Sequence, residues 1–478
     1  MDESSGDSVT NVRILGCATE PYVMRWKRAA YVLRLRAPDG SYGPRFRQNG
    51  KGGDMGRIDS LSFDTCDCGS AEVASGLVSV DDALAVLDRV VAPVSGIEVL
   101  PLGQAQGRVL AAAVRAESPV PHFDNAAMDG YALDTATLAG PGPWQLRVDG
   151  CIPAGKVGRG LPASSAAQVF TGAPIPPGTS AVIAQEEVHR EGECILLTSR
   201  PKPGENIRRA GSDMVAGTQI MVAGDRLGPA EIAAAAAAGR KELALRRRIR
   251  VAVLVTGDEL RAVGDPLSVA AIHDVNGPML AALLDRPDVE LIAPKRVGDS
   301  LDGIANTLSS LACEADLMVT TGGVSVGAAD FLRLAITRLG GRLHFAGVAM
   351  KPGKPVALGA LGHALWLGLP GNPLAALTSW ALFGGRVLDR LSGAPVLRPL
   401  RRQVVSEEPL SHRRGFCEFR PARLLGVDGG GREVIRFPPA THSHRVSDIV
   451  GFDGFAFLPA EIGAIPAGGW IEFLPFRL

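Results

Sequence analysis

The sequence has few aromatic residues and no net charge. Phe, Trp and Tyr make up 5% of the 478 residues, and 50 Lys and Arg balance 50 Asp and Glu, so the formal net charge is zero at pH 7. Without a basic surplus, the chain lacks the general attraction that draws proteins to nucleic acid or to anionic membranes. We therefore expect neither partner, and any anion site must be built locally.

Cysteine and long apolar runs are also scarce. The 7 cysteines are scattered and odd in number, which favours a reduced cytosolic protein over a disulfide scaffold. No apolar run is long enough for a transmembrane helix. Near the N-terminus, basic residues such as Arg25, Lys27 and Arg28 interrupt what would be the apolar part of a signal peptide. We predict a cytoplasmic location.

Apolar residues and turn formers are plentiful. Hydrophobic residues make up 46% of the chain, with 58 Gly and 34 Pro, and the length predicts roughly three or four domains. Residues 1–75 are polar and glycine-rich, which indicates a poorly ordered N-terminal extension. A helix capped by Ser79 or Asp81 follows, and residues 102–109 are a second helix candidate.

The second half of the chain alternates strand and helix signals. Over residues 248–396 this alternation predicts an α/β domain, with helices on both faces of a parallel or mixed sheet. Short runs broken by Gly and Pro in residues 121–204 predict a small β domain. Residues 397–478 show strands without helices and predict a C-terminal β domain. The fold class is therefore α/β plus β in a multidomain chain.

A Gly-rich loop follows the predicted strand at residues 316–320. It covers residues 321–327 and contains Gly322, Gly323, Ser325 and Gly327. Glycines let backbone N–H groups approach an anion closely, and the serine adds a hydroxyl donor. Ligands of open α/β sheets bind outside the carboxyl ends of the strands, which is where this loop falls. An ordinary strand-to-helix turn needs only one glycine, so we favour a phosphate site.

Two further loops are expected at the same sheet edge. Residues 350–355 form a turn, stiffened by two prolines, that presents Lys351 and Lys354. In a neutral protein this suggests an anion contact, although a solvated turn is the slightly better interpretation of the turn alone. The other loop ends a predicted strand and aims a helix N-terminus at the same region. Its residues are Pro370, Gly371, Asn372 and Pro373.

Carboxylates follow the same strands. Asp258 and Glu259 come after the first strand, Asp299 comes after the second, and Asp330 starts the helix after the Gly-rich loop. Each alone is more often a helix cap. Beside a phosphate site they suit Mg²⁺, which proteins hold through one or two carboxylates together with substrate phosphates.

Several long motifs make the chain resemble the molybdopterin molybdenumtransferase family, which includes the C-terminal part of gephyrin. The resemblance covers about residues 77–478. It rests on motifs that occur in the family's order, at residues 123–132, 171–176, 205–213, 256–260, 274–276, 321–330, 351–355 and 368–373. Ala126 departs from the family pattern, which has serine there. A basic residue is expected near Phe416, where this chain has Arg413 and Arg414.

The resemblance implies an elongated four-domain protomer in a homodimer. Residues 76–120 and 205–247 would form one discontinuous linker domain. The resemblance also implies the reaction: Mg²⁺-dependent insertion of molybdate into adenylylated molybdopterin, with release of AMP. The active cleft would combine the α/β domain of one subunit with the earlier motifs of the other. The molybdopterin adenylyltransferase and the proteins that mature molybdoenzymes are candidate partners.

The resemblance assigns site residues by motif position. The functional polar set is Asp129, Thr171, Asp213, Glu259, Asp299 and Asp330, of which Glu259 and Asp330 are the expected metal ligands. The residues expected to bind the pterin, the nucleotide and molybdate are Gly322, Gly323, Ser325, Gly327, Lys351, Lys354, Pro370, Gly371, Asn372, Pro373 and Ser443.

Two alternative functions stay open at this point. One is the adenylyltransferase step on molybdopterin, which a domain related to residues 250–392 performs alone. The early motifs around Asp129, Thr171 and Asp213 argue against it, because that domain works without them. The other is a gephyrin-like scaffold that binds peptides, mainly through the last β domain. The retained lysines and carboxylates favour an enzyme.

Overall fold

The computed structural model divides the chain into two compact units, residues 1–64 and 65–478. It describes residues 23–26, 29–32, 76–323, 331–395, 402–438 and 446–476. In the first unit, β1 (Val23–Trp26) and β2 (Ala29–Val32) form an antiparallel hairpin. The rest of the extension predicted at residues 1–75 lies outside the described residues. Within the described part, no helix has the length and apolarity needed to cross a membrane.

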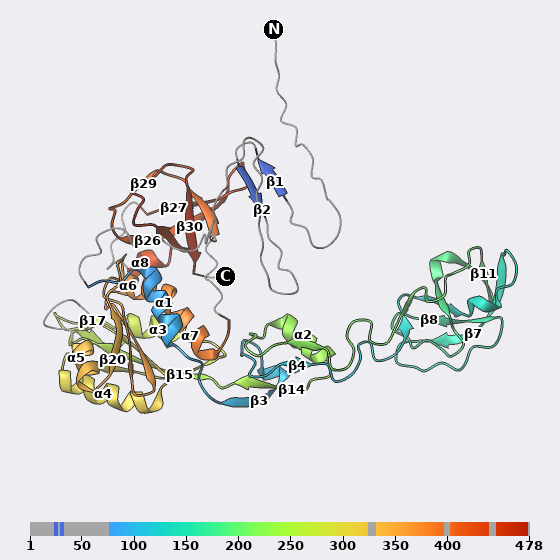
Figure 1. Cartoon of the computed structure of the whole chain (residues 1–478), viewed down its shortest axis with the longest axis horizontal. Coiled ribbons are helices and arrows are strands. Elements are labelled where there is room, and N and C mark those ends of the chain that lie inside the picture. Colours follow the sequence, from blue (N-terminus) through green and yellow to red (C-terminus); the bar gives the residue numbers. More distant parts are fainter. Residues whose placement is uncertain are drawn as a thin grey trace, which may run out of the picture. The chain divides into compact units, whose positions relative to one another are not determined.

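The α/β domain is built on a mixed sheet, in which Figure 1 labels β15 and β20. Its six strands lie in the order β18-β15-β19-β23-β22-β20. The first four strands are parallel, whereas β22 and β20 run antiparallel to their neighbours. Their bounds are β15 Ile249–Thr256, β18 Val289–Val297, β19 Leu317–Thr321, β20 Arg342–Ala346, β22 Ala357–Leu361 and β23 Ala364–Leu369. This arrangement confirms the predicted α/β domain.

Helices cover both faces of this sheet, and successive strand residues alternate between them. Val251, Val253 and Val255 join the core formed with α1 (Val80–Val90) and α3 (Asn276–Leu283). Ala252 and Leu254 join the opposite core with α4 (Leu301–Glu314) and α5 (Phe331–Arg338). Burial on both faces explains why β15 is apolar without interruption from Val251 to Val255. Ser79 caps α1, as predicted, by accepting from the Asp82 N–H.

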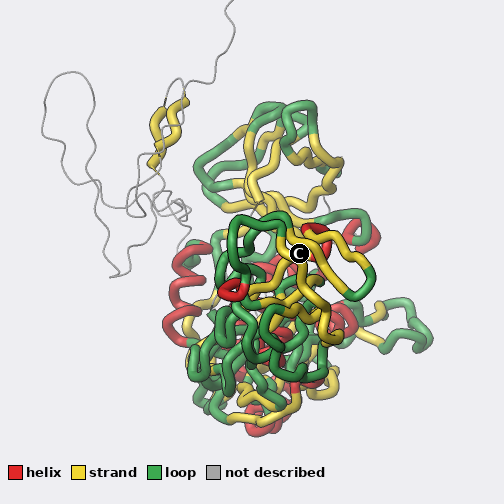
Figure 2. The backbone as a smooth tube through the Cα atoms, turned by 90° about the vertical axis from the view of Figure 1, so that its right-hand side faces the viewer, coloured by secondary structure: helices red, strands yellow, loops and turns green. Residues whose placement is uncertain are grey.

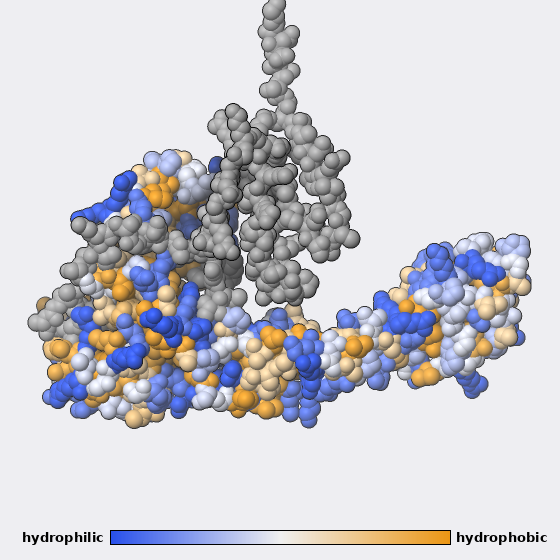
Figure 3. Space-filling view, viewed as in Figure 1, coloured by the Kyte–Doolittle hydropathy of each residue, from blue (hydrophilic) through white to orange (hydrophobic). Residues whose placement is uncertain are grey.

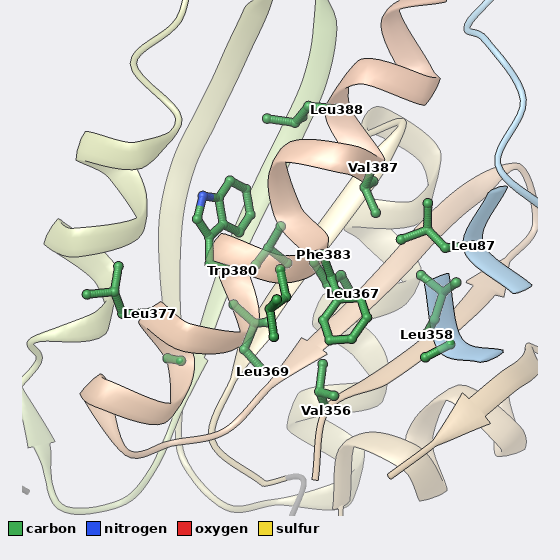
Figure 4. Close-up of a cluster of buried hydrophobic side chains, with 14 of the residues drawn as sticks. Leu87, Val356, Leu358, Leu367, Leu369, Leu377, Trp380, Phe383, Val387 and Leu388 are labelled. Atoms are coloured by element: carbon green, nitrogen blue, oxygen red, sulfur yellow. The ribbon is translucent and has the colours of Figure 1, made fainter. Parts of the chain in front are cut away.

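One long helical segment after β23 completes the first face. It consists of α6 (Pro373–Ser379), a π-helical turn (Trp380–Gly384) and α7 (Gly385–Ser392). Figure 4 shows Trp380, Phe383 and Val387 from this segment near Leu367 and Leu369 of β23. The wide turn brings Trp380 so close to Gly384 that a side chain at Gly384 would overlap the indole.

Residues 76–120 and 205–247 contribute the elements next to the α/β domain. The antiparallel strands are β3 (Ile97–Pro101) with β14 (Glu242–Arg246), and β4 (Val114–Arg115) with β13 (Gln219–Met221); α2 is Pro229–Ala237. Figure 3 shows apolar surface where β3 and α2 lie. It fits the exposure of Ile97 and Val99 on one face of β3.

The prediction of a helix at residues 102–109 is wrong. Only a 3₁₀ turn, Leu102–Gln104, forms there. Gly107 adopts a positive φ of 75°, which a right-handed helix cannot contain, and its N–H donates to Leu227 O instead of to a helical carbonyl. Two glycines in eight residues also lower helix propensity. Long-range pairing with the 224–227 segment therefore replaces local helical bonding.

Two other regions are mostly β, and in Figure 2 strands and loops dominate the trace. The first, within residues 121–204, has the sheet order β10-β11-β7-β8-β6-β9. Its strands are β6 Gly130–Leu133, β7 Trp144–Ile152, β8 Ser165–Val169, β9 Ala181–Ala184, β10 Val188–Glu191 and β11 Cys194–Leu197, with 3₁₀ turns at Thr135–Thr137 and Gln185–Glu187. Short strands β5 (Asn125–Ala126) and β12 (Ile207–Arg208) pair beside it.

The C-terminal region forms a sheet in the order β21-β26-β27-β24-β30-β28. Its elements are β21 Met350–Lys351, β24 Arg402–Ser406, β26 Cys417–Val427, β27 Glu433–Arg436, β28 Gly454–Leu458 and β30 Trp470–Pro475, with the separate pair β25 Leu410–Ser411 and β29 Ala464–Ile465. One short helix, α8 (Val446–Ile449), corrects the prediction of strands without helices.

A buried ion network joins the linker segment at residues 205–247 to the α/β domain. Arg226 donates to Asp288 at 2.7 Å and to Asp389 at 3.0 Å. Arg286 also donates to Asp288 through Nε and Nη2, both at 3.0 Å. Burial raises the pKa of Asp288, but the hydrogen bonds from Arg286 and the charges of both arginines outweigh it and lower the pKa below its ordinary value. The carboxylate is therefore ionised and fixes the junction.

Asp288→Asn should destabilise the junction by about 3 kcal/mol, because two arginines lose their shared buried anion. Since the folded pKa of Asp288 is depressed, its contribution is present above the ordinary pKa of 3.8 and is lost as the pH falls through the folded value. Calorimetry should therefore show a lower midpoint temperature for the first unfolding transition of the variant at pH 7. The difference from the wild type should disappear below about pH 4. Asp302→Asn is the control, because its pair with Arg338 is exposed; an equal loss there would contradict the expectation.

Candidate active site

The central sheet has a switch point between β15 and β19. The chain leaves β15 for β18 on one side and then returns to add β19 on the other side. Ligands of such sheets bind in the crevice at the carboxyl ends of the two strands. Here those ends are Thr256 and Thr321. The predicted Gly-rich loop starts at this crevice.

The first two glycines of that loop lie against the end of β15. Gly322 and Gly323 have φ values of 92° and 57°. A side chain at Gly322 would overlap Thr256 O, and one at Gly323 would come within 3.2 Å of Thr256 Oγ1. Glycine is therefore required twice over, by conformation and by close approach. Ser325, Gly327 and Asp330 lie outside the described residues.

The Pro-Gly-Asn-Pro loop lies directly beside Gly322. A Cβ at Gly371 would be 3.3 Å from Gly322 Cα. Asn276, at the start of α3, donates to Gly371 O and to Thr321 Oγ1, both at 2.7 Å. Thr321 in turn donates to Pro370 O at 2.9 Å. The structure thus brings the predicted Gly322, Gly323, Pro370 and Gly371 together, while Asn372 and Pro373 begin α6 next to them.

The two-lysine turn is anchored by Gly353. This residue has a φ of 112°, and a side chain there would come within 2.7 Å of Met350 Cε and Ser379 Oγ. Strand β21 also pairs with β26, so Met350 lies opposite Cys417 and Lys351 opposite Glu418. Lys351 and Lys354 are exposed. Neither has an ion-pair partner among the described residues, so both ammonium groups are available to a ligand.

Three carboxylates follow β15 and β18, as predicted. Asp258 Oδ1 accepts from the Asp299 N–H at 3.0 Å, so this carboxylate ties the ends of the two strands together. The Glu259 carboxylate folds back over Gly257, within 3 Å of where a Cβ would stand. Glu259 and Asp299 are exposed and bond no described side chain. Within the described ranges, no three His, Cys, Asp or Glu side chains cluster as a complete metal site.

A second group of predicted residues lies beside the small β sheet. The Thr171 N–H and hydroxyl donate to the same oxygen of Asp129, at 2.7 and 2.8 Å. The backbone bond and then the hydroxyl bond lower the pKa of Asp129. Asp129 is thus an anion at neutral pH with one oxygen, Oδ2, still free of these bonds.

The motifs around this pair are joined by short strands and one ion pair. Arg208 of β12 lies opposite Asn125 of β5. Asp124 accepts from the Ala210 N–H at 2.8 Å and from Arg209 at 2.6 Å, and these bonds lower the pKa of Asp124. Asp213 has an exposed side chain, and its N–H donates to Val120 O. The predicted Asp129, Thr171 and Asp213 thus belong to three motifs that lie together.

The two groups are not joined within one chain. Among the described residues, no hydrogen bond or ion pair links the Asp129 group to the loops of the central sheet. Ser443 lies outside the described residues.

Some residues of the first group were not predicted as site residues. Asn276 and Thr321 bond the Pro-Gly-Asn-Pro loop, and Thr256 lies against Gly322 and Gly323. A threonine at the end of a parallel strand is the signal that could have identified Thr256 and Thr321. Asn276 could not be found from spacing, because its two partners are 45 and 95 residues away in sequence.

Two family models match the chain. Residues 78–239 match the MoeA N-terminal region (domain I and II), and residues 252–390 match the probable molybdopterin binding domain of molybdenum cofactor biosynthesis proteins. The first match covers the Asp129 group, and the second covers the loops at the central sheet.

Curated relatives match over most of their length. The molybdopterin molybdenumtransferase 2 of Mycobacterium tuberculosis is 35% identical over 78% of this chain and 93% of its own. The molybdopterin molybdenumtransferase of Nostoc sp. is 37% identical over 78% of this chain and 87% of its own. A crystal structure of the molybdopterin biosynthesis moeA protein from Pyrococcus horikoshii OT3 is 27% identical, with a TM-score of 0.71, and covers 83% of this chain and 100% of its own.

Gly322→Ala should distort the crevice, whereas Gly340→Ala should not. Both positions have a positive φ, 92° and 78°, so both variants pay a similar backbone strain. Only at Gly322 would the new methyl group overlap Thr256, because nothing lies within 4 Å of a Cβ at Gly340. We expect Gly322→Ala to cost about 1–3 kcal/mol more in thermal unfolding. Equal losses would show that the close approach to Thr256 does not matter.

Proposed function

Because this chain belongs to the molybdopterin molybdenumtransferase family, a transferase family of molybdenum cofactor biosynthesis, we propose that it inserts molybdate into adenylylated molybdopterin and releases AMP. The observation that supports this most is the close approach of the start of the Gly-rich loop to the Pro-Gly-Asn-Pro loop at the sheet edge. Two exposed lysines lie on an anchored turn of the same domain. Both proposed substrates are anions, and these groups are suited to anions.

The reaction needs charge neutralisation more than it needs a nucleophilic side chain. Cleavage of a phosphoanhydride spreads negative charge over phosphate oxygens, so positioned donors and cations supply most of the catalysis. In the proposal, the backbone N–H groups after Thr321 bind the phosphates. Lys351 and Lys354 attract molybdate and the pterin side of the substrate. Arg413 and Arg414 precede β26, which pairs with the lysine turn, and they extend the basic surface there.

A magnesium ion fits this site only together with the substrate. Glu259 offers an exposed carboxylate without a described partner at the end of β15, which is a hard oxygen donor of the type Mg²⁺ prefers. Together with Asp330 it would hold the ion, and phosphate oxygens would supply further ligands. The ion would neutralise charge on the phosphoanhydride. Asp258 is less suited, because the Asp299 N–H already occupies one of its oxygens.

We further propose that the complete cleft needs two chains in a homodimer. Among the described residues, the Asp129 group has no bond to the central-sheet loops of its own chain, and the bonds from Thr171 lower the pKa of Asp129. Exposed apolar side chains flank these residues in the sequence, namely Phe123, Met128 and Phe170. Exposed apolar side chains gathered among polar groups are typical of a surface that a partner covers. The partner subunit's central sheet would cover it.

The function is tested by supplying purified protein with adenylylated molybdopterin, molybdate and Mg²⁺ and measuring AMP by chromatography. We expect AMP release that depends on molybdate and falls when Mg²⁺ is chelated. Asp330→Asn should severely impair this release while the protein stays folded. AMP release at the same rate without molybdate would refute the transferase step.

The shared cleft is tested by mixing two inactive variants, Asp129→Asn and Lys351→Ala. If each site combines the two groups from different chains, a mixed dimer has one doubly altered site and one intact site. After reassortment of the subunits, AMP release should recover to roughly a quarter of the wild-type rate, because half of the dimers are mixed. Sites contained in one chain would give no recovery, since every site would then carry one substitution.

A further inference from the structure

Two adjacent threonines end strand β19, and their side chains point to opposite faces of the sheet. Thr320 Oγ1 accepts a 2.9 Å hydrogen bond from Trp366 Nε1, on the face covered by α4 and α5. Thr321 Oγ1 lies on the α3 face, where it accepts from Asn276 and donates to Pro370 O. Both threonines have 0% exposure. The chain therefore holds two matched buried hydroxyls, and only that of Thr321 bonds the active-site loops.

The donor and acceptor roles around Thr321 are fixed by chemistry. Pro370 and Gly371 contribute carbonyl oxygens, which only accept, so the Asn276 atom near Gly371 must be the amide nitrogen. One of its hydrogens goes to Gly371 O and the other to Thr321 Oγ1, each at 2.7 Å. The Thr321 hydroxyl hydrogen then goes to Pro370 O at 2.9 Å. Every donor hydrogen of the two side chains is used on this loop network.

These bonds set the distance between the Gly-rich loop and the Pro-Gly-Asn-Pro loop. The two loops meet at glycines, which have no side chains to pack. Gly371 lies against Gly322, where a Cβ would already be 3.3 Å from the neighbouring Cα. Glycines provide no packing that could hold a fixed separation. Without Thr321, the carbonyl of the buried Pro370 would lose this donor, and an unpaired buried carbonyl is costly.

Asn276 occupies this position at a cost in folding free energy. The residue is 6% exposed, and its Oδ1 is buried without a partner among the described residues. A buried acceptor left unpaired loses the hydrogen bonds that water would give it. An apolar residue would avoid that cost but could not donate to the two loops. The cost is therefore consistent with selection for positioning rather than for stability.

We propose that Asn276 and Thr321 form a clamp that positions the Gly-rich loop against the Pro-Gly-Asn-Pro loop and so orients the phosphorylated substrate between them. The identity of that substrate rests on the proposed function; the clamp itself rests on the contacts above. Both are positioning residues, because they act through the two loops and need not touch the substrate.

The matched threonines make the clamp testable by steady-state kinetics of AMP release. Thr321→Val keeps shape and burial but removes the hydroxyl, and kcat/KM should fall about 100-fold, mostly in kcat, because the loops no longer hold the reacting groups in register. Thr321→Ser restores the hydroxyl and should recover most of the lost turnover. Thr320→Val removes an equally buried hydrogen bond on the other face and should lower thermal stability while kcat/KM keeps its wild-type value.

Asn276→Asp is a second, nearly isosteric variant. Its carboxylate cannot donate to Gly371 O, so we expect a loss of kcat/KM as large as that of Thr321→Val. Equal activity losses in Thr320→Val and Thr321→Val, at equal losses of stability, would overturn the clamp, since any buried hydrogen bond would then have the same effect.

Hydrogen exchange gives a readout that does not depend on catalysis. In Thr321→Val, the amides of residues 371–376 other than Pro373, which has no N–H, should exchange faster than in the wild type, and in Thr320→Val they should not. If the wild type releases no molybdate-dependent AMP, the proposed function fails, but this comparison still decides the clamp. If exchange in residues 371–376 is the same in all variants, the clamp fails, whatever the activity.

Discussion

The whole arrangement depends on how closely backbone can approach backbone at the carboxyl ends of β15, β19 and β23. These strands are packed on both faces, so their ends are fixed by two hydrophobic cores. Gly322 meets Thr256 on one side and Gly371 on the other, at separations that leave no room for a Cβ on Gly322. The loops can therefore present N–H groups at a narrow crevice without side chains in the way. Polar bonds from buried side chains, rather than packing, hold them there.

Sequence alone predicted the positions of the described loops where the signals are contiguous in the chain. Glycines after a buried strand, a lysine turn stiffened by prolines and a Pro-Gly-Asn-Pro loop are all contiguous signals, and strand polarity then places them at one edge of the sheet. The apolar run of β15 likewise indicated a buried parallel strand, as the structure has it. These features follow from short-range rules of conformation and burial.

Other features depend on partners far away in the sequence and could not be predicted from it. Asn276 gains its role only when β19 and β23 become neighbours. Residues 102–109 have helical spacing, but Gly107 bonds Leu227 across the linker segment instead. Arg226 likewise finds Asp288 and Asp389 only in the folded chain. Helical periodicity depends only on neighbours in the sequence, whereas the bonding partners of these residues depend on which elements the fold brings together.

Electrostatics suggests why the carboxylate of Asp129 belongs to a different part of the chain from the lysine turn. The chain has zero net charge, so it does not attract anions over long distances. The attraction of Lys351 and Lys354 for an anion is therefore local and is screened within about 10 Å. A fixed carboxylate beside the lysines would weaken that attraction. The carboxylates Asp258, Glu259 and Asp299 follow β15 and β18, on the other side of the sheet from β20 and β22, which flank the lysine turn. Thr171 lowers the pKa of Asp129, and among the described residues this carboxylate bonds none of the central-sheet loops. A carboxylate delivered only on assembly could act on the bound substrate without repelling it during capture, which would separate binding from reaction in one cleft.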